Sequence, residues 1–171
     1  MSSQQPASIP PGSQSDPRTI LGACQMIENL CARLYSELAR AHAQDHEAHF
    51  VWNKTAEEEL NHAQQIAMAL RLTQGKGLDP NVDLRRAHAT ISMLRSSLND
   101  ARARPPSVVD ALRMAVSLEE HLSRFHLEEA TVIDDPAMKS LFRAMQAADR
   151  QHVETLRALL SRRDPPAATC P

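Results

Sequence analysis

The chain of 171 residues is poor in glycine, with four, and in aromatic side chains, which make up 3% of it. Valine and isoleucine are also sparse, whereas alanine, leucine, glutamate, glutamine and arginine abound. The sparse residues favour strands and the abundant ones favour helices. The composition therefore predicts an all-α protein, long enough to form one domain around a buried core.

Cysteine is scarce as well. The three cysteines, Cys24, Cys31 and Cys170, form no Cys-x-x-Cys pair, so neither a disulfide framework nor a zinc knuckle is indicated. A reducing, cytoplasmic location is therefore expected. The N-terminal segment lacks the basic and apolar regions of a signal peptide. No apolar run approaches the roughly 20 residues that a membrane span needs, so no membrane partner is expected.

A surplus of basic charge is also missing. Lysine and arginine number 19 against 21 aspartates and glutamates, which gives a net charge of −2 with neutral histidine. Domains that bind nucleic acid usually carry a basic stripe on one face. No nucleic-acid partner is therefore expected.

The chain divides into a central helical region and two polar ends. Residues 1–15 are rich in proline, serine, glutamine and glycine and are expected to be disordered. Residues 163–171 are expected to form a flexible tail. Between them, residues 16–162 carry apolar side chains at helical spacing, which predicts one helical domain.

Start and stop signals divide this domain into five predicted helices. Asp16-Pro17, Ser107-x-x-Asp110 and Asp135-Pro136 each read as a helix start. The predicted helices span about 17–43, from the break near 44–46 to before Gly75, 83–100, 107–133 and 136–162. Two helix hairpins joined by a long crossover, with a short extra helix inside it, favour an antiparallel four-helix bundle of ferritin-like topology.

Two stretches of the chain carry the same pattern of acids and histidines. In each, a single glutamate precedes, at almost the same distance, an acid and a histidine spaced three apart. The first stretch holds Glu28, Glu59 and His62, and the second holds Glu119, Asp149 and His152. All six fall on the apolar stripes of the predicted helices, which is the ligand pattern of a dinuclear metal site inside a four-helix bundle.

The chemistry of these side chains suits metal ions. Residues three apart on a helix project to the same side, so each acid and its histidine can reach one ion. Carboxylates with one imidazole per ion suit iron, manganese or zinc. Glu59 and Asp149 are the expected bridging ligands, with Glu28 and Glu119 terminal. The alternative is that these acids and histidines merely form salt bridges at the surface.

The first half also resembles a known family. Glu28, Cys31-Ala32 and Tyr35-x-x-x-Ala39, followed by Ala56-Glu-Glu-Glu59-Leu-Asn-His62-Ala63, resemble the first two helices of rubrerythrins and bacterioferritins. The resemblance covers about residues 17–162. It implies a ferritin-like bundle with a non-haem dimetal centre, commonly two iron ions. Members reduce peroxide, react with dioxygen, or oxidise and store iron.

Some positions depart from the family pattern. Asp149 stands where the family usually has glutamate. Val116 and Leu122 flank Glu119 where rubrerythrins add a further carboxylate, which favours the six-ligand, bacterioferritin-like set. The cysteine pairs of a rubredoxin domain are also missing, so an external electron-donor protein is expected. The resemblance further implies a homodimer or a larger homo-oligomer.

Three more residues are candidates for a place beside the metals. Tyr35 could hydrogen-bond to a ligand or relay an electron, or could simply be a core tyrosine. His126, its counterpart in the second half, could be a hydrogen-bond donor to a ligand, an occasional ligand, or a satisfied core histidine. Cys31 could take part in redox chemistry or serve as a small hydrophobe. By contrast, Glu57, Glu58 and Glu120 are expected to face solvent.

The leading functional hypothesis is an oxidoreductase that uses two iron ions, or manganese or zinc, with peroxide or dioxygen. The first alternative is a ferroxidase that stores or delivers iron. The second is a non-enzymatic bundle with a structural metal site.

Overall fold

The computed structural model describes residues 19–73 and 84–165, and these form five helices. No strand occurs among them, which confirms the predicted all-α class. The helices are α1 (Ile20–Ala41), α2 (His46–Thr73), α3 (Arg85–Ala103), α4 (Val108–Val132) and α5 (Pro136–Arg163).

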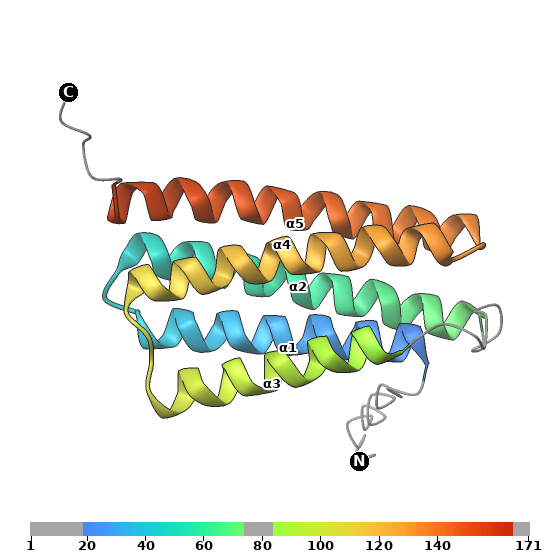
Figure 1. The fold of residues 1–171 in the computed structure, drawn as a ribbon, viewed down its shortest axis with the longest axis horizontal. Coiled ribbons are helices and arrows are strands. Elements are labelled where there is room, and N and C mark those ends of the chain that lie inside the picture. The colour runs from blue at the N-terminus through green and yellow to red at the C-terminus, as the bar shows by residue number, and fades with distance from the viewer. Residues whose placement is uncertain (1–18, 74–83, 166–171) are drawn as a thin grey trace, which may run out of the picture.

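The helices are arranged as two antiparallel hairpins with one additional helix (Figure 1). α1 packs along α2, and α4 packs along α5. The two hairpins lie side by side with their long axes in the same direction, and α2 meets α5 between them. α3 lies against α1 and runs the length of the hairpin before α4 begins. It corresponds to the helix predicted inside the crossover.

The helix starts follow side-chain caps. Thr19 caps α1 by accepting a hydrogen bond from Gly22 N–H at 3.1 Å, whereas the cap predicted at 16–17 lies outside the described residues. Ser107 caps α4 and Asp135 caps α5, both as predicted. Each accepts a backbone N–H of the first helical turn, which would otherwise lack a partner.

A continuous apolar core fills the space between the helices. Trp52, Phe125, Phe142, Leu34 and Leu112 are among its fully buried side chains. The core is interrupted by a layer of buried acids and histidines. The predicted disorder of residues 1–15 lies outside the described residues, as does most of the predicted tail, whose first residue still belongs to α5.

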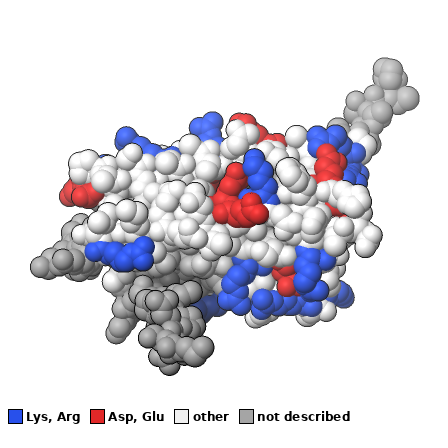
Figure 2. All heavy atoms as spheres, turned by 180° about the vertical axis from the view of Figure 1, so that it is seen from behind, with Lys and Arg blue, Asp and Glu red and all other residues white. Residues whose placement is uncertain are grey.

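Two further features concern the charged side chains on the surface and the apolar character of the helices. Basic and acidic side chains are interspersed on the face drawn in Figure 2. Among the described residues, no helix has the length and the apolar character needed to cross a membrane.

Candidate metal centre

All four long helices contribute to one buried polar layer between the two hairpins. The carboxylates are completely buried, and the two histidines are 7% and 5% exposed. α1 supplies Glu28, α2 supplies Glu59 and His62, α4 supplies Glu119, and α5 supplies Asp149 and His152. The structure thus brings together all six residues that the repeat singles out, and the alternative of surface salt bridges is wrong for them.

The first group of possible ligands consists of Glu28, Glu59 and His62, whose donor atoms lie within 4.8 Å of one another. Nδ1 of His62 lies 3.3 Å from Oε2 of Glu59 and 3.4 Å from Oε2 of Glu28. Two donors bound to one ion at about 2.1 Å can be up to about 4.2 Å apart. Both distances from Nδ1 of His62 are within this limit.

The second group consists of Glu59, Glu119, Asp149 and His152, again within 4.8 Å. Nδ1 of His152 lies 3.1 Å from Oε1 of Glu59 and 3.1 Å from Oε2 of Glu119. Glu59 belongs to both groups, as expected of a bridging carboxylate. Asp149, the second expected bridge, belongs to this group alone, and its Oδ2 is hydrogen-bonded to Nδ1 of His126 at 2.8 Å.

Several carboxylate oxygens in this layer lack a hydrogen bond. Both oxygens of Glu28, Oε1 of Glu59 and Oδ1 of Asp149 are buried without a hydrogen bond, although an imidazole nitrogen lies 3.1–3.4 Å from each of the first three. A buried carboxylate oxygen without a partner is unfavourable unless a cation or a donor reaches it. Hard oxygen donors with one imidazole nitrogen per group suit a divalent ion such as iron, manganese or zinc. The donor set therefore fits a metal.

Tyr35 and His126 occupy related places in the two halves. The Tyr35 hydroxyl donates a hydrogen bond to Oε1 of Glu119, from the other hairpin. Nε2 of His126 lies 3.1 Å from Oε1 of Glu28, again across the hairpins, and both side chains are fully buried. Each half thus supports the single glutamate of the other half. This places both residues beside the predicted ligands.

The close packing of acids and histidines in this layer shifts the pKa values of their side chains. Burial opposes protonation of His62 and His152, but the carboxylates beside them outweigh burial and raise their pKa values to about 10 and about 11. Burial opposes the charge of Glu28, yet His126 and His62 lower its pKa to about 2. Burial and the charge of Glu59 raise the pKa of Glu119 to about 8, against the effect of His152. A metal that binds here must displace protons from the imidazoles.

Cys31 is buried in the same region, on α1. Burial, with the charges of Glu59 and Glu28, raises the pKa of its thiol well above the ordinary value. The thiolate, which is the reactive form, is therefore disfavoured. This is consistent with the interpretation of Cys31 as a small hydrophobe, and its predicted place beside the metals stays a prediction.

A pocket of about 320 Å³ between α2 and α5 reaches the layer from outside. His62 and His152 line its inner end, and Phe50, Lys54 and Glu58 are among its other lining residues.

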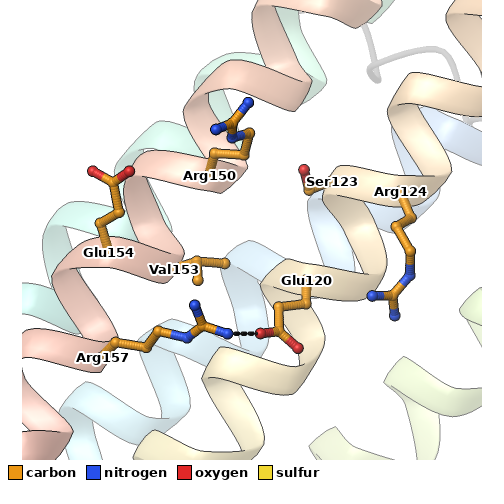
Figure 3. Close-up of a pocket in the computed structure, with 7 residues that line it drawn as sticks. All are labelled: Glu120, Ser123, Arg124, Arg150, Val153, Glu154 and Arg157. Atoms are coloured by element: carbon orange, nitrogen blue, oxygen red, sulfur yellow. Dashed lines mark hydrogen bonds and ion pairs between the residues drawn. The ribbon is translucent and has the colours of Figure 1, made fainter.

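The predicted solvent exposure of Glu58 is only part of what the structure shows, since its side chain is 41% exposed at the pocket. Glu58 does not simply face solvent, since its Oε2 lies 2.8 Å from Nε2 of His152. This contact could not be predicted from the sequence, because Glu58 lies beside Glu59 on α2 whereas its partner is on α5. Glu120, by contrast, faces outward as expected. It pairs with Arg157 in a groove on the outer side of α4 and α5 (Figure 3).

The histidines near the α1–α2 turn form no further ligand group in the described part of the chain. Nδ1 of His49 lies 2.8 Å from the carbonyl oxygen of Ala39, and the His42 ring packs 5.2 Å from that of Trp52.

A scan against known protein-family models finds no match to this chain, and searches of curated proteins and of solved structures find none either.

Proposed function

We propose that this chain is a non-haem dimetal carboxylate protein with a ferritin-like four-helix fold. We further propose that it is an oxidoreductase whose centre, preferably of two iron ions, reacts with peroxide or dioxygen. The observation that carries the proposal is the pair of buried ligand groups that share Glu59. Such groups, built from facing helices with acid-x-x-His pairs, are typical of dimetal sites in helical bundles.

The two ligand groups show which residues would hold the ions. Glu28 and His62 would hold one ion, Glu119, Asp149 and His152 would hold the other, and Glu59, which belongs to both groups, would serve both. Two iron ions, when bound, supply the electron pair that reduction of an O–O bond requires.

The chain supplies the surroundings of the reaction. The apolar core keeps bulk water from the carboxylates, and the pocket between α2 and α5 admits a molecule as small as hydrogen peroxide. Reduction of hydrogen peroxide to two waters takes two protons and two electrons. The two protons are taken up from the surrounding buffer through the pocket between α2 and α5. The electrons come from an external electron-donor protein, since the sequence has no cysteine pairs of the rubredoxin kind.

Metal analysis tests the centre directly. Protein loaded with Fe(II) without oxygen and then desalted should retain about two ions per chain. His62→Ala and His152→Ala should each lose about one of them, while His46→Ala, an exposed control on α2, should lose none. A wild-type protein that retains no metal under these conditions would refute the dimetal proposal.

A second candidate, ferroxidase with iron storage or delivery, has a specific observation in its favour. Glu58 places a carboxylate at the pocket that leads to the histidines, and carboxylates attract cations. Peroxide turnover with a chemical reductant favours the oxidoreductase. A large shell by light scattering, with many irons per chain, favours storage. Metal binding without turnover or storage favours a structural site.

A further inference from the structure

The two histidines of the centre differ in what their outer nitrogens contact. Nδ1 of His152 faces the carboxylates of Glu59 and Glu119, and Nε2 points the other way, 2.8 Å from Oε2 of Glu58. The His152 side chain is only 6% exposed, whereas that of Glu58 is 41% exposed at the pocket. A partly solvated carboxylate therefore contacts a buried imidazole whose other nitrogen faces the candidate metal position.

The repeat shows that this contact belongs to one half only. Glu58 immediately precedes Glu59, and the residue that immediately precedes Asp149 is Ala148. Both Glu58 and Ala148 line the pocket between α2 and α5. A methyl group cannot accept a hydrogen bond, and in the described part of the chain the structure shows no carboxylate at Nε2 of His62.

We propose that Glu58 is a positioning residue for His152. By accepting a hydrogen bond from Nε2–H, Glu58 holds the imidazole with Nδ1 directed at the centre and makes the His152 half bind its metal more tightly than the His62 half. A carboxylate on the outer nitrogen of a ligating histidine fixes the tautomer and orientation of the ring and makes it a better donor. The proposal rests on the dimetal function proposed above.

Glu58 is itself held in place. Its Oε1 lies 3.6 Å from Nζ of Lys54, one turn earlier on α2, while Oε2 contacts His152. Lys54 is exposed, so this pair adds little energy on its own. It nevertheless favours the arrangement in which one oxygen of Glu58 faces solvent and the other faces the imidazole.

Titration with Co(II) or Zn(II), followed by calorimetry, tests the proposal. Wild-type protein should bind two ions in unequal steps. Glu58→Ala should weaken the tighter step by about 10- to 100-fold, the range found for loss of such a partner, and leave the other step unchanged. Glu58→Gln, whose amide oxygen can still accept, should restore part of the loss. Glu57→Ala, a neighbour that lines a different groove with Asn29, is the matched control.

The reciprocal variant makes the test sharper. Ala148→Glu should place a carboxylate near Nε2 of His62 and bring the weaker step closer to the stronger one. Equal weakening of both steps in Glu58→Ala, or no change in either, would overturn the role of Glu58 and leave the dimetal function standing. A wild-type protein that binds neither ion would instead contradict the dimetal function.

Nuclear magnetic resonance of chelator-treated protein gives a readout without any metal. The Nε2 proton of His152 should exchange slowly with water in the wild-type protein and quickly in Glu58→Ala. The ring signals of His62 should be the same in both. A His152 signal that does not respond to Glu58→Ala would contradict the contact on which the proposal depends.

Discussion

Among single residues, Glu59 has the central place. One of its oxygens lies 3.3 Å from Nδ1 of His62, and the other lies 3.1 Å from Nδ1 of His152. It is the one residue that belongs to both ligand groups of the described chain. Every other carboxylate of the layer belongs to one group. Loss of Glu59 should therefore affect both metal positions, whereas loss of a terminal ligand should affect one.

Glu59→Gln is expected to reduce the metal content from about two ions per chain to about none, and Glu28→Gln to about one. Glutamine keeps the size of glutamate but removes the negative charge that two cations would share. Elemental analysis of iron-loaded, desalted protein measures the difference. Retention of both ions by Glu59→Gln would show that it is not the bridge.

His126 has a different role, because it links two helices through two carboxylates. Its Nε2 lies 3.1 Å from Glu28 and its Nδ1 lies 2.8 Å from Asp149, with no exposure to water. Burial opposes its charge, but the charge of Glu28 and the hydrogen bond to Asp149 raise its pKa well above the ordinary value. His126 therefore stabilises two buried negative groups that would otherwise repel.

His126→Phe is expected to lower the free energy of unfolding of chelator-treated protein by about 3–5 kcal/mol, because it leaves buried carboxylates without their partner. Bound metal should reduce this loss by neutralising the same carboxylates. Urea denaturation with and without metal measures both values. His46→Phe, at an exposed site, should change stability by no more than about 0.5 kcal/mol. A loss equal to that of the control would remove His126 from this role.

The buried cluster of six acids and histidines could be predicted from the sequence because helical spacing brings each acid and its histidine to one side and because the same pattern occurs in both halves. Contacts between helices were harder to predict. The sequence paired Tyr35 with His126 as counterparts but did not identify their partners, Glu119 and Glu28. It assigned Glu58 to solvent because nothing along α2 indicates which residue of α5 lies opposite.

At the scale of the helices, α4 and α5 begin where short sequence signals predict. The Ser107 hydroxyl accepts from Asp110 N–H at 3.2 Å and donates to the Asp110 carboxylate at 2.7 Å. Asp135 accepts from Met138 N–H at 2.8 Å, with Pro136 in the first turn. These interactions span three residues, so they can be read without knowledge of the fold. The existence of α3 was predictable for a similar reason, since its buried residues recur with helical period.

Asp135→Ala is expected to destabilise the protein by about 1 kcal/mol, the usual effect of losing an N-cap side chain. Thermal or urea denaturation measures the change. Asp134→Ala is the matched control, because Asp134 is exposed, carries the same charge and precedes the cap. Equal effects of the two variants would mean that charge near the start of α5, and not the cap, sets the stability.

At the scale of the whole molecule, the hairpins meet through a polar layer. The first ligand group lies wholly on the α1–α2 hairpin, whereas the second combines Glu59 of that hairpin with Glu119, Asp149 and His152 of the other. Packing the hairpins together buries four carboxylates, which the neighbouring imidazoles compensate. Metal binding at this layer would therefore be linked to folding through the same side chains.

This linkage predicts that the stability of the metal-free protein falls as pH rises, whereas its affinity for metal increases. His62 and His152 have folded-state pKa values of about 10 and about 11, above their ordinary value of 6.5. Their contribution to stability is fully present below pH 6.5 and is lost as pH rises through those values. Glu119, whose pKa is raised to about 8, acts in the same direction. Glu28, with its pKa lowered to about 2, affects only the acid side.

The free energy of unfolding of chelator-treated protein should therefore fall steadily between pH 6.5 and about 10, as measured by urea denaturation. A bound metal requires imidazoles without a proton at Nδ1, so metal affinity should rise over the same range. The stability gap between loaded and chelator-treated protein should widen with pH. His62→Ala should flatten the decline, because it removes one of the groups that lose their protons. A chelator-treated protein whose stability stays constant or rises over this range would show that these histidines are not paired with the carboxylates in the folded chain.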